Sequence, residues 1–146
     1  MKYMGSKNRY AKEILPIILK GRTNEWYVEP FVGGANVIDK VEGNRIGADS
    51  NSYLIALLYF VPSENDLSII PDSISETEYN NIKNNKDAYP DWLVAFCGFN
   101  ATFGSKWFGG YARPRKNGYD RDVICGKSAL IKQAPNLKGV KFICDS

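Results

Sequence analysis

The segment YVEPFVGGANV, residues 27–37, restricts the possible fold of this chain more than any other part of it. A short apolar run ends at Glu29, and the pair Gly33-Gly34 follows. A second run over residues 45–48 ends at Asp49, twenty residues after Glu29. Glycines between a strand and a helix let the backbone turn tightly and approach a ligand. The pattern predicts a β-α-β unit of a parallel, doubly wound α/β sheet.

Turn, cap and periodicity signals place the other elements. Strands are expected over 25–29, 45–48 and 140–144. A helix near residues 10–15 is capped by Ser6 or Asn8 and ended or kinked at Pro16. The other expected helices run over 35–41, 52–61 after a cap at Asn51, 75–84 from the capping box at Ser75, 91–102 after Pro90, and 122–134 after a cap at Asp122.

By its length of 146 residues the chain is a single domain. Residues 1–61 and 135–146 are expected to form the α/β sheet, with three parallel strands. Residues 62–134 are expected to form a helical insertion between them. The chain is therefore predicted to be a partial Rossmann-like α/β protein with a helical insertion.

Composition excludes several classes of site. The chain has three widely spaced cysteines and no histidine, which excludes a Cys/His zinc site and a histidine-based triad. No metal is expected. The longest apolar runs, 14–19 and 54–61, are too short to span a bilayer, and the N-terminus does not resemble a signal peptide. The protein is expected to be soluble and cytoplasmic.

The glycine turn has two interpretations, a ligand-binding loop or a β-α-β turn without a ligand. A helix N-terminus after the glycines would favour an anion, and Asp49 at the end of the second strand is placed to accept hydrogen bonds from ribose hydroxyls. The glycine pair alone is a weak signal and favours a turn without a ligand. Glu29, Phe31 and the spaced Asp49 together favour the ligand.

The basic residues gather at one end of the sequence. Residues 1–100 carry ten Lys/Arg against thirteen Asp/Glu, whereas residues 101–146 carry nine against three. Residues 97–121 interleave aromatic side chains with cations, a pattern that suits stacking on bases and neutralising phosphates. The alternative is that these aromatics fill the core beneath a long loop while the cations are merely solvated.

YVEPFVGGANV, together with GADSNSYLI and the N-terminal YMGSK, resembles the Dam-type DNA adenine methyltransferases, particularly their phage members. The resemblance implies a Rossmann-like methyltransferase sheet, S-adenosylmethionine as cofactor and a cytoplasmic protein of phage or prophage origin. Many members have a second glycine where this chain has Ala35, and a methyl group there is expected to narrow the turn. The cofactor-binding residues that the resemblance implies are Tyr3, Met4, Lys7, Glu29, Pro30, Phe31, Gly33, Asp49 and Ser50.

The stretch GSKWFGGYAR also resembles phage adenine methyltransferases, within the inserted region that contacts DNA. It implies double-stranded DNA as a partner. The DNA-binding residues expected on this basis are Lys106, Trp107, Arg113, Arg115, Lys116 and Arg121.

The family's catalytic loop has the pattern (D/N/S)-P-P-(Y/F/W), whose oxygens accept the hydrogens of the adenine amine while its aromatic ring stacks on the flipped base. None of the seven prolines here is adjacent to another, so no catalytic residue is assigned. We expect a truncated methyltransferase that is inactive alone. The alternatives are a non-enzymatic DNA-binding or interaction module derived from such an enzyme, and one half of a split enzyme. Strand 25–29 would then be an open edge, which predicts self-association, a complementing chain or a rearranged strand.

Overall fold

The structure is a computed structural model that describes residues 1–115 and 118–145. Within these residues three parallel strands form one sheet in the order β1-β2-β3. The strands are β1 (Tyr27–Glu29), β2 (Arg45–Asp49) and β3 (Val140–Cys144). Val28 pairs with Ile46, and Gly47 pairs with Phe142. The predicted α/β class and the sheet of three parallel strands are confirmed.

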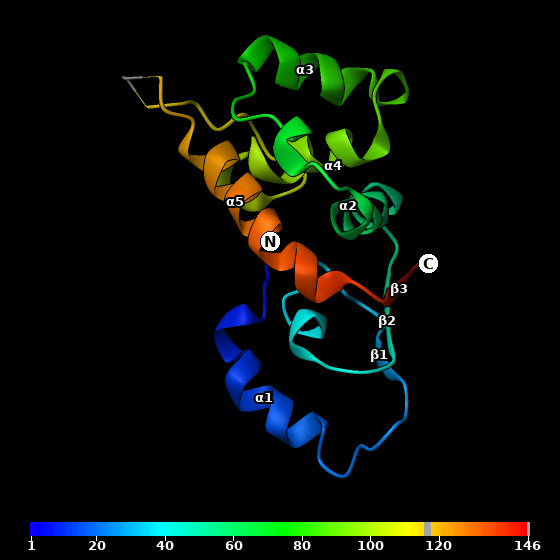
Figure 1. The fold of residues 1–146 in the computed structure, drawn as a ribbon. Helices are drawn as coiled ribbons and strands as arrows, with labels where there is room; N and C mark the ends of the chain where they lie inside the picture. Colours follow the sequence, from blue (N-terminus) through cyan, green and yellow to red (C-terminus); the bar gives the residue numbers. More distant parts are fainter. Residues whose placement is uncertain (116–117, 146) are drawn as a thin grey trace.

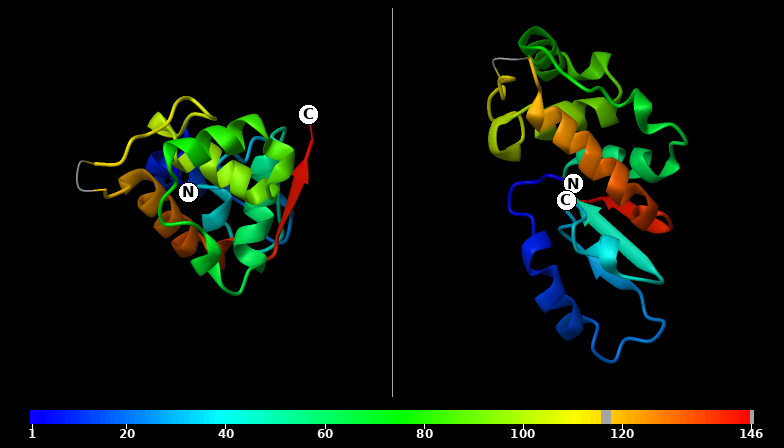
Figure 2. Two further views of the ribbon diagram at one scale, coloured as in Figure 1. Left: turned by 90° about the horizontal axis from the view of Figure 1, so that it is seen from above. Right: turned by 60° about the vertical axis from the view of Figure 1, so that its left-hand side comes forward.

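Helices cover the sheet and extend away from it (Figure 1). In the described residues the α-helices are α1 (Ala11–Ile18), α2 (Ser52–Ser63), α3 (Glu76–Asn84), α4 (Asp91–Asn100) and α5 (Arg121–Leu137). The 3-10 helices are η1 (Asn8–Tyr10), η2 (Ile38–Lys40), η3 (Leu67–Ile69), η4 (Lys86–Ala88) and η5 (Phe103–Ser105). The long helix α5 runs from the region of α3 and α4 back to the sheet, whereas α1 lies apart from the other helices (Figure 2).

Two predicted helix starts are confirmed by their caps. The Asn51 side chain accepts a hydrogen bond from the backbone N–H of Leu54 at 3.1 Å, and the Ser75 hydroxyl accepts one from Glu78 at 3.1 Å. These bonds satisfy donors that the first turn of a helix leaves free. The predicted cap at Asp122 is wrong. Asp120 caps α5 by accepting from the N–H of Val123 at 3.2 Å, because its carboxylate is buried between α5 and the chain before α3.

The predicted helix over residues 35–41 is also wrong. Ala35 has a φ of 55°, in the left-handed region, and this breaks a right-handed helix at its first residue. Only the short η2 forms after the glycine turn. At the N-terminus no side chain caps α1, so neither Ser6 nor Asn8 has the predicted role, and α1 continues two residues past Pro16.

One continuous cluster of buried apolar side chains joins the sheet to the insertion. Helix α2 lies at its centre, with Leu54, Leu57 and Leu58 fully buried, because its sequence is apolar on every face. Phe96 of α4 and Leu130 of α5 are also fully buried. No helix in the described part of the chain is long and apolar enough to cross a membrane.

Candidate functional site

The carboxyl ends of β1 and β2 meet at the glycine turn. The N–H of Gly33 donates a hydrogen bond to Oδ2 of Asp49 at 3.1 Å, and the N–H of Asn51 donates to Oδ1 at 3.1 Å. The N–H of Val32 donates to the carbonyl of Ala48 at 2.8 Å. A carboxylate can accept about four hydrogen bonds, so Asp49 keeps acceptor capacity after these two.

The N-terminal segment packs directly on this turn. Gly33 has a φ of +48°, and a Cβ atom built there would lie 2.8 Å from Cε1 of Tyr3. A Cβ on Gly34 would lie 2.8 Å from Cβ of Tyr3. Because the two glycines have no Cβ atom, the chain can turn tightly here and the side chain of Tyr3 can pack directly on the backbone. Burial, and secondarily the Asp49 carboxylate, raises the pKa of Tyr3, so its phenol keeps its proton.

Glu29 ends β1 beside the same turn. Its Oε2 accepts a hydrogen bond from the N–H of Ile38 at 3.1 Å. Burial raises the pKa of Glu29 to about 7, although the bond from Ile38 and the positive charge of Lys7 act in the opposite direction. A cationic group placed here would favour the ionised carboxylate, which is the property of a site for an ammonium or sulfonium ion.

Two neighbouring cavities connect the predicted residues. A small one of about 40 Å³ is lined by Tyr3, Lys7, Glu29, Phe31 and Gly33, among others. The structure therefore brings together five of the nine predicted cofactor residues, and Asp49 is bonded to one of them. Met4 and Ser50 are exposed and line neither this cavity nor the larger one beside it.

The larger cavity, of about 690 Å³, runs along β1 and α1 and shares Lys7, Glu29 and Phe31 with the small one. Its volume lies in the range of small-molecule sites. Pro30 lines it, as do apolar side chains that the sequence did not single out: Ile14, Ile18, Trp26 and Val28. In the described residues β1 pairs on one side only, so this cavity lies along a free sheet edge.

The expected helix N-terminus for an anion is absent from the described turn. Two backbone donors of this region are already used, since Gly33 donates to Asp49 and Ile38 donates to Glu29. The turn is thus organised by two carboxylates. No group of three or more His, Cys, Asp or Glu side chains among the described residues could hold a metal ion.

The aromatic residues of the basic segment divide into two groups. Trp107 is half-buried, with its ring 5.8 Å from that of Tyr53 and 4.8 Å from that of Phe108. Tyr111 also packs inward and donates its hydroxyl to the carbonyl of Ile74 at 2.7 Å. Core packing, the alternative to base stacking, is therefore what the structure shows for these rings. Phe103, in contrast, is 81 % exposed.

Four of the predicted DNA-binding cations are exposed: Lys106, Arg113, Arg115 and Arg121. Arg113 forms an exposed ion pair with Glu76 at 3.6 Å, and exposed pairs of this kind are weak. Lys116 lies outside the described residues.

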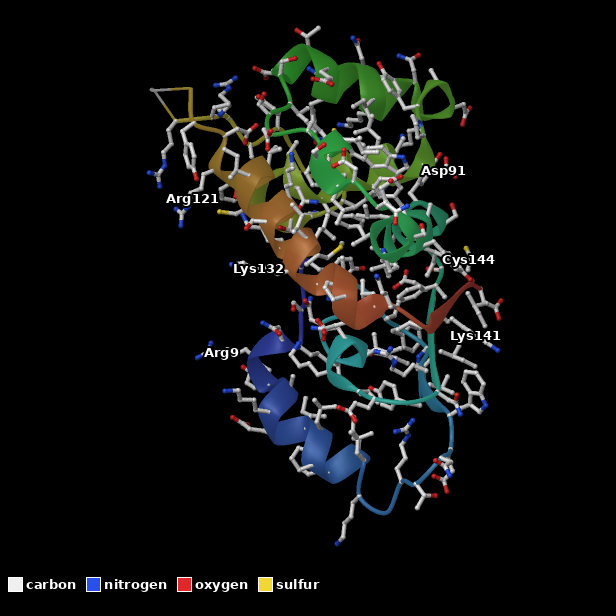
Figure 3. The ribbon with its side chains drawn as sticks, in the orientation of Figure 1. Arg9, Asp91, Arg121, Lys132, Lys141 and Cys144 are labelled. Atoms are coloured by element: carbon white, nitrogen blue, oxygen red, sulfur yellow. The ribbon has the colours of Figure 1, made fainter. Side chains whose placement is uncertain are left out.

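Figure 3 shows Arg121 and Lys132 of α5 and Arg9 of η1 along one edge of the molecule. Arg9 and Lys132 were not predicted to bind DNA, because both lie outside the basic segment at residues 97–121.

A search of curated proteins found no match to this sequence. A family model described as D12 class N6 adenine-specific DNA methyltransferase matches residues 3–92, which is more than half of the chain. The match includes Tyr3, Lys7, the glycine turn and Asp49, and it ends before the basic segment at 97–121. Methyltransferases of this class generally use S-adenosylmethionine and act on DNA. The chain therefore belongs to the D12 class of N6 adenine-specific DNA methyltransferases.

Proposed function

We propose that residues 1–61 and 135–146 bind S-adenosylmethionine and that residues 62–134 recognise DNA, as the corresponding parts of a Dam-type, phage-like adenine N6-methyltransferase. The observation that carries this proposal is the convergence of Tyr3, Asp49 and Glu29 on one glycine turn. Tyr3 covers Gly33, Asp49 accepts from Gly33, and Glu29 lines the same cavity. Both carboxylates also organise the turn, and their position beside a cavity favours a ligand over a turn without one.

The residues fit the chemistry of this cofactor. Asp49 keeps acceptor capacity for ribose hydroxyls, and Glu29 lies where it can pair with the methionine ammonium group. Phe31, 81 % exposed, offers an apolar wall, while Tyr3 and Lys7 cover the other side. The cofactor supplies the activated methyl group. Pro30, which lines the larger cavity, and the exposed Met4 and Ser50 complete the proposed set.

DNA recognition is proposed for the exposed cations of the basic segment. Lys106, Arg113, Arg115 and Arg121 would neutralise phosphates of double-stranded DNA, and Lys116 is included on its sequence alone. Phe103 replaces Trp107 as the aromatic best placed to stack on a base, because Trp107 is packed against other rings.

Transfer to adenine also needs acceptors that hold the exocyclic amine. The 146 residues contain no pair of adjacent prolines that could provide them. We propose that these groups come from a complementing polypeptide or region, which would pair with the free edge of β1 beside the larger cavity. The free edge that β1 has in the described residues should make this chain prone to self-association when it is alone. Sedimentation should show concentration-dependent association, and a thermally stable monomer at all concentrations would contradict it.

Titration with S-adenosylmethionine or S-adenosylhomocysteine tests the cofactor proposal directly. Binding measured by calorimetry should be saturable, and DNA binding should weaken steeply with added salt. Absence of both heat and thermal shift at millimolar ligand, with DNA binding retained, would instead favour the non-enzymatic DNA-binding module.

A further inference from the structure

The glutamine of α5 connects parts of the chain that are far apart in sequence. Gln133 is 5 % exposed, and its Nε2 donates to the carbonyl of Gly34 at 3.1 Å and to the carbonyl of Ala35 at 2.9 Å. The same Nε2 lies 2.9 Å from Oδ2 of Asp39. Its Oε1 accepts a hydrogen bond from the α-amine of Met1 at 2.6 Å. A buried amide with both ends satisfied can fix several segments relative to one another.

The hydrogen bonds of Gln133 have their largest effect on the backbone conformation of Ala35. It is a fully buried residue with a φ of 55°, a conformation that costs an L-residue about 1–2 kcal/mol. The two carbonyls that Gln133 contacts belong to the peptide units on either side of the Ala35 Cα atom. One amide group therefore restrains both φ and ψ of Ala35. The glycine turn keeps its shape although alanine stands where glycine would adopt it freely.

The α-amine of Met1 completes the arrangement from the other side. It donates to Oδ1 of Asn36 at 2.8 Å, and the carbonyl of Gly34 lies 3.3 Å from it. Asn36 in turn donates to the carbonyl of Met1 at 3.0 Å and to the hydroxyl of Ser6 at 2.8 Å. These bonds hold the first six residues on the turn, and Tyr3 lies between their two anchor points. Loss of the bond between Gln133 and the amine should therefore loosen the packing of Tyr3 on Gly33.

We propose that Gln133 is a positioning residue for the cofactor site, which it shapes by holding the Ala35 turn and the Met1 amine together. The inference rests on the proposed function, because the turn and Tyr3 form the cofactor cavity. Gln133 lines neither of the two cavities beside β1, so it acts through the backbone that it holds.

The test compares Gln133→Leu with Asn136→Leu, which changes an exposed amide one turn later on the same helix. Affinity for S-adenosylhomocysteine should fall about tenfold in Gln133→Leu, because the carbonyls of the turn and the Met1 amine lose their buried partner, and should stay unchanged in Asn136→Leu. Adding Ala35→Gly to Gln133→Leu should recover much of the loss, because glycine adopts the turn without help. Ala35→Gly alone is the control, because it relieves the same backbone strain and should leave the affinity unchanged while Gln133 is present.

A measurement without ligand separates this inference from the proposed function. Reductive methylation of the Met1 α-amine should be slow in the unsubstituted protein and in Asn136→Leu, and fast in folded Gln133→Leu. Should Gln133→Leu fail to fold, one glycine added before Met1 displaces the amine and leaves α5 unchanged. It should lower the affinity by a similar factor. Unchanged affinity and unchanged amine protection in these variants would overturn the positioning role. If the unsubstituted protein binds no ligand, the proposed function fails, and the methylation rates still decide whether the amide holds the amine.

Discussion

The carboxylate of Asp49 accepts a hydrogen bond from the backbone N–H of Gly33 at 3.1 Å, which ties the end of β2 to the turn after β1. The same side chain accepts from Asn51 at the start of α2. Asp49 thus organises the protein side of the cavity and still keeps acceptors for a ligand. Its role in binding and its role in shape have to be separated by experiment.

Asp49→Ala should weaken binding of S-adenosylhomocysteine by about 1–3 kcal/mol, because it removes hydrogen bonds to the ribose hydroxyls. Asp49→Asn keeps one acceptor and should weaken it less. Calorimetric titration measures both, with Glu42→Ala as the control at an exposed carboxylate. Wild-type affinity in Asp49→Ala would show that Asp49 serves the turn alone.

Binding should depend on pH through Glu29. Because burial raises the pKa of Glu29 to about 7, the carboxyl group is partly protonated near neutrality, and a cationic ligand must bind the ionised form. Affinity should therefore increase as the pH rises from about 6 to 8, with release of a proton. Titration in buffers of different ionisation enthalpy measures that release. Glu29→Gln should bind more weakly and lose this pH dependence.

Glu29 also affects the stability of the free protein. Its pKa is about 7 in the folded state against 4.5 for the ordinary group, so the folded state binds more protons between these values. This contribution to stability is present below pH 4.5 and is lost as the pH rises through 7. Urea unfolding of Glu29→Gln and the unsubstituted protein should show the variant gaining relative stability over this range.

The Met1 amine affects the pH dependence of stability in the direction opposite to Glu29. The stability of Glu29→Gln is therefore compared with that of the unsubstituted protein at each pH, so that the contribution of the amine cancels. Burial lowers the pKa of the amine from 8.0 to about 5, with the Asp39 carboxylate opposing the change. Its contribution is present above pH 8 and is lost as the pH falls toward 5. A relative stability of Glu29→Gln that does not vary between pH 5 and 8 would contradict the role given to Glu29.

Two aromatic residues of one segment should respond differently to removal. Trp107→Ala should destabilise the fold by about 2–4 kcal/mol, since it leaves a cavity among Tyr53, Phe99 and Phe108. Phe103→Ala should leave unfolding unchanged and weaken DNA binding by about 1–3 kcal/mol through loss of stacking. Thermal unfolding and fluorescence anisotropy with a DNA duplex measure the two effects. Equal effects on both properties would contradict this division.

The exposed arginines should contribute to DNA affinity through phosphates. Arg115→Ala and Arg121→Ala should each lower affinity on all sequences and reduce the slope of log K against log salt by about 1. Lys12→Ala removes an exposed cation of α1 and serves as the control. A salt slope that stays the same in both arginine variants would place the DNA elsewhere.

Much of the fold followed from local patterns. The strand at 140–144, the caps at Asn51 and Ser75 and the parallel sheet were predicted, because each depends on residue types within a few positions. The helix expected at 35–41 failed because Ala35 adopts a conformation that its own residue type disfavours. The cap at Asp122 failed because two acidic residues were equally suitable, and only Asp120 is buried against the chain at Ile74.

The sequence by itself determined the family, the parallel sheet and some of the residues that meet at the glycine turn, among them Tyr3, Glu29 and Asp49. Tertiary structure alone decided which aromatic rings face inward and how the turn is held. Gln133 reaches Ala35 across 98 residues, and the Met1 amine reaches Gln133 across 132. Caps and turns depend on hydrogen bonds between neighbours, which residue types specify. The hydrogen bonds of Gln133 to residues distant in sequence form only because α5 is packed against the sheet. The residue types near Gln133 in the sequence do not specify that packing.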